Sequence, residues 1–162
     1  MFLIEIYTSE ENTPAKALPI ALALHREFPQ SSVMHLAFCS VLYQMKRWAE
    51  MKKEAQLFLD RSENEVPYYT RDGIRPARYC LGVGALYGRH DLDLAYAYMS
   101  QILKTQDASR WVSYAFLRRG QIEDLRGDRE TALRDYRTVL SRQNFWGSHE
   151  EAQTYIKNAF KF

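Results

Sequence analysis

The side chains best suited to metal or acid–base chemistry in this sequence are its four histidines, His25, His35, His90 and His149. A zinc-protease helix carries two histidines four residues apart, because the His-Glu-x-x-His spacing places both imidazoles on one helical face. The sequence contains no such motif and no close pairing of histidines on one helix face. We therefore expect surface or partly buried imidazoles, with no metal and no cofactor bound.

Other catalytic patterns are equally weak. Gly82, Gly84 and Gly88 in GVGALYG resemble a nucleotide-binding loop, but the stretch follows no strand and lies in a helical pattern, which favours close helix packing. No Gly-x-Ser-x-Gly motif is present, and no serine or cysteine has an identifiable base partner. Cys39 and Cys80 form no Cys-x-x-Cys pattern, so we expect buried thiols, with a disulfide left open. We predict that the chain is not an enzyme.

A group of arginines near the C-terminal end raises the question of nucleic-acid binding. They are Arg118, Arg119, Arg126, Arg129, Arg134, Arg137 and Arg142. Acidic residues alternate with them, namely Glu123, Asp124, Asp128, Glu130 and Asp135. The formal charge of the whole chain, +2, is too small to imply nucleic acid or an anionic membrane by itself. Ion pairs on helix surfaces explain the arginines at least as well as an RNA track, so RNA binding is the weaker alternative.

Composition predicts a helical protein. The chain has 162 residues, of which 46% are hydrophobic and 26% charged, as in ordinary soluble domains. Strong helix formers are plentiful and β-branched residues are sparse, which favours an all-α fold. No run approaches 18 apolar residues, and the first residues, MFLIEIYTSEEN, have no basic leader. We expect a cytoplasmic protein without a membrane span, and the sequence leaves open whether it is a fragment of a longer one.

A recurring spacing organises the chain. In GDRETALRDYRTVL, residues 127–140, a turn-forming glycine is followed by a small residue, an aromatic and an aliphatic at offsets of 5, 9 and 13. The small-residue position recurs through the chain at Ala17, Met51, Ala95 and Ala132. From the second onward, each is preceded by another stretch with helical apolar periodicity, so the repeating unit is a helix, a short turn and a second helix.

The expected turns carry residues that end one helix and begin the next. Asp91 and Asp128 are suited to cap helix N-termini, and Gly127 to the left-handed conformation that ends a helix. Pro14 suits a first helical position. Ser148, followed by Glu151, matches the capping-box pattern and predicts the start of a last helix.

This spacing resembles the tetratricopeptide repeat (TPR) family, whose unit is a helical hairpin of 34 residues. The best match lies in residues 113–146, through Gly120, Gly127, Ala132, Tyr136 and Leu140. The resemblance implies an all-α fold, a right-handed α-α superhelix of stacked hairpins with a C-terminal capping helix. It implies a single array over residues 1–162, made of a partial unit (1–31), three further units (32–75, 76–112 and 113–146) and a capping helix (148–160).

The resemblance also implies a peptide groove, because in TPR proteins the first helices of successive hairpins line a concave surface. The matching positions here are Val33, Leu36, Ser40, Tyr43, Ala77, Cys80, Gly84, Tyr87, Tyr114, Leu117, Gln121 and Asp124. Each of them has packing between helices as its alternative role. Leu36 and Ser40 stand where carboxylate-binding TPR proteins use Lys and Asn, so we expect an apolar, tyrosine-rich groove for an amphipathic helix or apolar peptide.

The function implied by the resemblance is that of a non-catalytic protein–protein interaction scaffold whose partner the sequence does not identify. A self-associating assembly domain is the first alternative, because an incomplete first hairpin would leave Phe2, Leu3, Ile4 and Ile6 uncovered. RNA binding by the last hairpin is the second.

Overall fold

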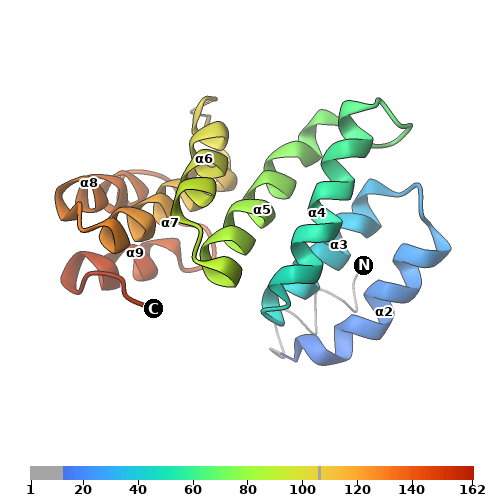
Figure 1. The fold of residues 1–162 in the computed structure, drawn as a ribbon, viewed down its shortest axis with the longest axis horizontal. Coiled ribbons are helices and arrows are strands. Elements are labelled where there is room, and N and C mark those ends of the chain that lie inside the picture. The colour runs from blue at the N-terminus through green and yellow to red at the C-terminus, as the bar shows by residue number, and fades with distance from the viewer. Residues whose placement is uncertain (1–12, 106) are drawn as a thin grey trace. The chain divides into compact units, whose positions relative to one another are not determined.

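The computed structural model describes residues 13–105 and 107–162, and every regular element within them is helical. The order is α2 (Pro14–Glu27), α3 (Ser32–Gln44), α4 (Trp48–Glu63), the short 3-10 helix η2 (Arg71–Gly73), α5 (Ile74–Arg89), α6 (Leu92–Leu103), α7 (Arg110–Arg126), α8 (Arg129–Leu140) and α9 (Ser148–Lys157) (Figure 1). The predicted all-α fold is confirmed, whereas a superhelix of the TPR type stays a prediction. Of the helices in the described ranges, none combines the length and hydrophobicity needed to cross a membrane.

The chain divides into two compact units, residues 1–84 (unit 1) and 85–162 (unit 2), with the boundary inside α5. In unit 1, α3 packs against both α2 and α4. In unit 2, α7 packs against α6 and α8, and α9 contacts both α7 and α8. Neighbouring helices therefore pack in chain order within each unit, as short connections favour. The single array over 1–162 is still a prediction.

The predicted helix ends are confirmed at several turns. Asp91 accepts a hydrogen bond from the Leu94 backbone N–H at 3.0 Å, and Asp128 accepts one from Thr131 at 3.0 Å. The bond from Thr131 holds the pKa of Asp128 below its ordinary value. Gly127 has φ +82°, the left-handed conformation that costs glycine least, and Pro14 is the first residue of α2. These residues account for where the α5–α6 and α7–α8 connections turn.

The capping box predicted at Ser148 and Glu151 is wrong. The N-cap of α9 is Gly147, with φ +79°, so Ser148 is already the first helical residue. The side chain of Asn144 takes over the capping, because its Oδ1 accepts hydrogen bonds from the His149 N–H and from the Ser148 hydroxyl, both at 3.2 Å. Glu151 instead pairs with Arg118. The last helix also ends at Lys157, three residues before the predicted end.

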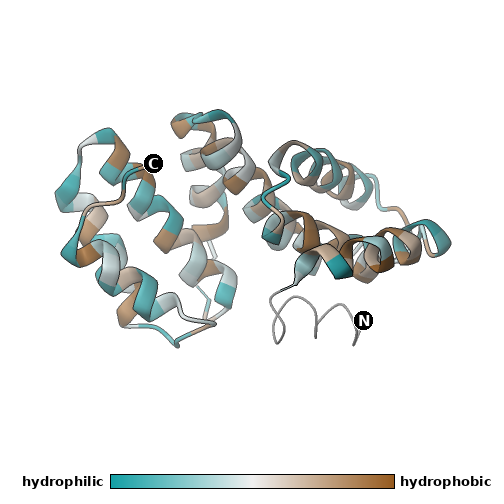
Figure 2. Cartoon of the chain, turned by 90° about the horizontal axis from the view of Figure 1, so that it is seen from below, coloured by the Kyte–Doolittle hydropathy of each residue, from teal (hydrophilic) through white to brown (hydrophobic). Residues whose placement is uncertain are grey.

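The recurring small and aromatic positions meet in the core of unit 2. Ala132 and Tyr136 are fully buried there, with Leu117, Val139 and Ala152. Gly120 lies so close to the ring of Tyr136 that a Cβ atom at Gly120 would stand 2.5 Å from Tyr136 Cε1. α7 and α8 therefore approach through the glycine, and the tyrosine ring fills the space. Along the helices of both units, hydrophobic and hydrophilic residues alternate, as expected where one face is buried (Figure 2).

Both cysteines are buried and free, as predicted for thiols without a pairing motif. Burial raises the pKa of Cys80 to about 12. It also raises the pKa of Cys39 well above the ordinary value, and the nearby Cys80 adds to that rise. Both side chains therefore act as small apolar groups within unit 1.

The contact between Gly120 and Tyr136 predicts that Gly120→Ala destabilises unit 2. Alanine has the better helix propensity by about 1 kcal/mol, but overpacking against the ring outweighs it, for a net loss of about 1–2 kcal/mol. Thermal unfolding followed by circular dichroism measures the change. In a Tyr136→Leu background the same glycine substitution should cost less, because the ring is gone; an equal cost in both backgrounds would contradict the assigned contact.

Candidate functional site

The predicted groove positions of α3 lie on one face of that helix and keep solvent exposure. Val33 is 54% exposed and Ser40 is exposed, while Leu36 and Tyr43 are half-buried. The ring of Tyr43 contacts those of Trp48 and Tyr79. This part of the predicted groove is accessible to a ligand in unit 1.

Most of the other predicted groove positions lie inside the protein. Ala77, Cys80, Gly84, Leu117 and Gln121 are all buried. Leu117 belongs to the core cluster of unit 2 and Gln121 Oε1 accepts a hydrogen bond from the half-buried Tyr87 hydroxyl at 2.7 Å. These residues pack against other helices, whereas the sequence predicted that they contact a peptide. Helical spacing identifies the residues on one face of a helix, but it does not show whether that face meets solvent or another helix.

Asp124, a further predicted groove residue, has a side chain with no exposure at all. Its carboxylate accepts hydrogen bonds from Arg129 Nη1 at 2.8 Å, the Tyr136 hydroxyl at 2.9 Å and the Phe160 backbone N–H at 2.7 Å. Burial, with this bond to Asp124, raises the pKa of Tyr136. Asp124 thus joins α7, α8 and the segment after α9 and cannot contact a bound peptide.

Three arginines of unit 2, Arg118, Arg119 and Arg129, serve internal ion pairs. Arg119 makes two bonds of 2.6 Å to the buried carboxylate of Asp135, which raises the pKa of Arg119. Arg118 is itself buried and pairs with Glu151 at 2.5 Å. Arg129, besides its bond to Asp124, donates to the carbonyls of residues 155 and 156 near the end of α9. These pairs hold helices together and account for three of the seven clustered arginines.

The burial of Asp124 predicts that Asp124→Ala costs about 3–5 kcal/mol of stability, because it leaves the Arg129 charge and two other donors without their acceptor. Denaturant titration of the purified variant measures the loss. The control is Asp93→Ala, since Asp93 pairs with Arg126 but is 95% exposed, and its melting temperature should match that of the parent chain. Equal stability of the two variants would contradict the role assigned to Asp124.

An exposed aromatic group in unit 2 includes one predicted groove residue, Tyr114. Trp146, between α8 and α9, is 77% exposed and stacks on Tyr114 with ring centroids 6.5 Å apart and planes at 25°. The guanidinium carbon of Arg110 lies 4.6 Å from the ring centroid of Trp146 and 4.9 Å from that of Trp111. We call Arg110, Trp111, Tyr114 and Trp146 the tryptophan surface.

The backbone around Trp146 is held firmly. The Phe145 carbonyl accepts hydrogen bonds from the Tyr114 hydroxyl at 3.0 Å and from the Ser148 N–H at 2.9 Å. The Phe145 N–H donates in turn to the Ser148 hydroxyl at 3.1 Å. Trp146 has φ +43°, a left-handed conformation that is rare for a bulky residue and persists only where its surroundings impose it. The exposed ring is therefore fixed in position before any partner arrives.

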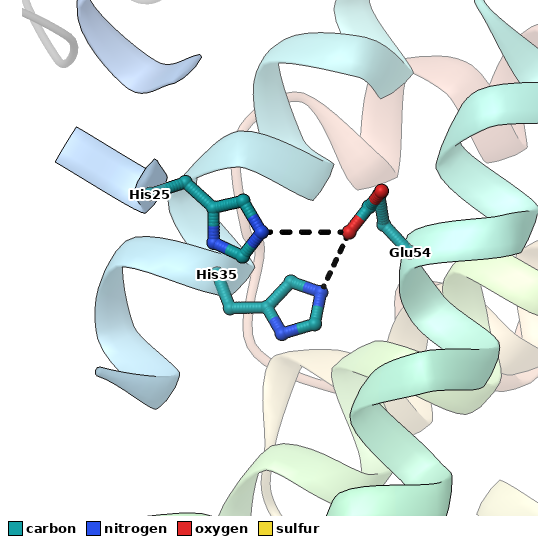
Figure 3. A group of neighbouring side chains, drawn as sticks. All are labelled: His25, His35 and Glu54. Atoms are coloured by element: carbon teal, nitrogen blue, oxygen red, sulfur yellow. Dashed lines mark ion pairs between the residues drawn. The ribbon is translucent and has the colours of Figure 1, made fainter. Parts of the chain in front are cut away.

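A second group of interest lies in unit 1, where three helices bring His25, His35 and Glu54 together (Figure 3). His25 comes from α2, His35 from α3 and Glu54 from α4. Both Nε2 atoms face the same carboxylate oxygen, Glu54 Oε2, at 3.5 Å for His25 and 3.2 Å for His35. We call these three residues the histidine cluster.

The surroundings of the histidine cluster keep its imidazoles neutral. Burial, together with the neighbouring His25 and Arg61, lowers the pKa of His35 to about 4. Burial also lowers the pKa of His25, although Glu54 opposes that shift. On its other side, His35 Nδ1 lies 3.1 Å from the hydroxyl of the buried Tyr69, which is hydrogen-bonded to Arg61 and to the Pro29 carbonyl. The Tyr69 hydroxyl therefore contacts the His35 ring on one side, and the Glu54 carboxylate faces it on the other.

Sequence reasoning missed both the histidine cluster and Trp146. The sequence patterns considered for metal binding place two histidines on one helix, whereas His25, His35 and Glu54 each come from a different helix. Tyr69, which contacts His35, lies in the connection between α4 and η2 and carries no metal-binding motif. Comparison with protein-family models, curated proteins and solved structures finds no match to this chain.

Proposed function

We propose that this protein is a non-catalytic, TPR-like helical scaffold that binds a partner protein or peptide, and that the tryptophan surface is its main contact. The observation that carries the proposal is the exposed Trp146 ring, fixed by its stacking on Tyr114 and by the hydrogen-bonded Phe145 backbone. Tryptophan, tyrosine and arginine dominate the binding energy of protein interfaces. A side chain ordered in advance also loses less entropy when a partner binds.

The composition of the tryptophan surface indicates the chemistry of the partner. The Trp146 and Tyr114 rings offer apolar area to an apolar peptide or to the apolar face of an amphipathic helix. Arg110, adjacent to both tryptophans, is placed to pair with an acidic group beside that apolar segment. The partner that fits is therefore an amphipathic peptide with apolar residues next to a carboxylate.

The two alternatives are weaker. RNA binding depended on the arginines, and Arg118, Arg119 and Arg129 are engaged with Glu151, Asp135 and Asp124. Self-association depended on the apolar residues between Phe2 and Ile6, which lie outside the described residues. Neither alternative has an observation comparable with the ordered, exposed tryptophan.

The test is a peptide-display selection on the intact chain, followed by calorimetry with the selected peptides. We expect peptides that combine apolar and acidic residues, and a loss of about 2 kcal/mol, roughly thirtyfold in Kd, for Trp146→Ala. The matched control is Tyr68→Ala, because Tyr68 in unit 1 is also a highly exposed aromatic (74%) with a positive φ of +70°. The control should bind like the parent chain.

The selection also has an outcome that excludes the proposal. If the peptides bind the parent and Trp146→Ala equally while both remain folded by circular dichroism, the tryptophan surface is not the contact. If the peptides are lost from Tyr68→Ala instead, the contact lies in unit 1.

A further inference from the structure

The geometry points to a binding site for a divalent transition-metal ion of the Zn²⁺ type, formed by His25 Nε2, His35 Nε2 and Glu54 Oε2. All three atoms lie within 4.8 Å of one another. Two imidazoles and one carboxylate are a donor set that zinc proteins use, with the fourth position open to water. The site lies in unit 1 and does not depend on the function proposed for the tryptophan surface in unit 2.

The two spacings that involve Glu54 Oε2 suit a tetrahedral ion. Zinc bonds of about 2.0–2.1 Å place neighbouring ligand atoms of a tetrahedron roughly 3.4 Å apart. The two distances from Glu54 Oε2 are 3.5 Å to His25 and 3.2 Å to His35. The carboxylate oxygen thus stands near the tetrahedral spacing from both nitrogen atoms. The dashed lines in Figure 3 join it to the two rings.

Two of these atoms lack hydrogen-bond partners inside the protein. His35 Nε2 and Glu54 Oε2 are buried, and neither forms a hydrogen bond, although they lie close to each other. His35 as a whole has no solvent exposure. A buried polar atom without a hydrogen bond is destabilising, and these two are directed at each other. A cation between them would satisfy both, because each would then supply a lone pair to the ion.

The contact of His35 Nδ1 with the Tyr69 hydroxyl is of the kind that metal-binding histidines usually have. In such sites the ring nitrogen away from the metal is hydrogen-bonded to a neighbouring group, which fixes the ring orientation. His35 Nδ1 lies 3.1 Å from the Tyr69 hydroxyl, and that hydroxyl donates to the Pro29 carbonyl at 3.2 Å. With its hydrogen directed to Pro29, the hydroxyl accepts from Nδ1–H, which leaves Nε2 without a proton and able to bind a metal.

An ion can reach the histidine cluster from a pocket. His25 and Glu54 line a pocket of about 360 Å³ together with Leu22, Phe38 and Glu50. The pocket leaves room for the water that completes a tetrahedral coordination. Arg61 adds positive charge nearby, and its guanidinium is engaged with Tyr69 and the Pro29 carbonyl. A bound ion would link α2, α3 and α4, the three helices that supply the ligands.

The first test is calorimetric titration of the chelator-treated chain with Zn²⁺ alone. We expect saturable binding of about one ion per chain, with a rise in melting temperature, since an ion that binds only the folded state stabilises it. Glu54→Gln should weaken binding more than about a hundredfold. Tyr69→Phe removes the hydroxyl that contacts His35 Nδ1, Arg61 and the Pro29 carbonyl, and should weaken binding about ten- to a hundredfold. Glu50→Gln, on the same helix and lining the same pocket, should bind like the parent chain.

A second measurement is independent of those variants and of their folding. In the parent chain, Zn²⁺ should shift the NMR signals of the His25 and His35 rings and leave those of His90 and His149 unchanged. The proposal is overturned if the parent chain shows no saturable Zn²⁺ binding, if the His25 and His35 signals do not move, or if folded Glu54→Gln binds Zn²⁺ as tightly as Glu50→Gln does.

Discussion

The close contact between Gly120 and the Tyr136 ring is the constraint on which unit 2 depends. It lets α7 and α8 approach each other, and it buries the tyrosine so deeply that its hydroxyl needs an internal acceptor. Asp124 supplies that acceptor, and a buried carboxylate in turn needs more donors than one hydroxyl. Arg129 and the Phe160 N–H provide them, which attaches the segment after α9 to the same point. The close contact between Gly120 and Tyr136 thus determines the hydrogen-bond network around Asp124.

The two units handle buried polar groups differently. In unit 2, carboxylates such as Asp135 and Asp124 are matched by arginines with short, well-aligned bonds. In unit 1, Glu54 faces two imidazoles with which it forms no hydrogen bond, and burial disfavours the protonated rings that would pair with it. A network in which every polar group is hydrogen-bonded stabilises a scaffold. A metal ion instead requires atoms whose lone pairs are not already used in hydrogen bonds. This contrast is why the metal site is assigned to unit 1.

The proposed binding function and the proposed metal site are physically compatible. The tryptophan surface needs a rigid support, and the hydrogen bonds at Phe145 together with the core of unit 2 supply it. The histidine cluster acts only on the helices of unit 1, where a bound ion would hold α2 to α3 and α4. The tryptophan surface and the histidine cluster therefore each have their own structural basis, and a test of one does not test the other.

The sequence by itself determined the helical fold, several helix ends and the small and aromatic positions, Ala132 and Tyr136, that are buried in unit 2. These features depend on local chemistry. They follow from helix propensity, from helix capping by the Asp91 and Asp128 side chains, from the left-handed backbone of Gly127 and from the spacing of Ala132 and Tyr136. Among the predicted groove residues, the sequence could not separate Val33, which is exposed, from Leu117, which is buried. Periodicity shows which residues share a face, but the neighbouring helix decides whether that face is covered.

Only the tertiary structure decided which residues from distant segments meet. His25, His35 and Glu54 belong to three helices, and Trp146, in the connection between α8 and α9, meets Tyr114 of α7. The left-handed backbone of Trp146 and the shift of the α9 cap to Gly147 likewise depend on hydrogen bonds made by Asn144, Tyr114 and Ser148. Contacts of this kind are set by how whole helices pack, and no local spacing encodes them.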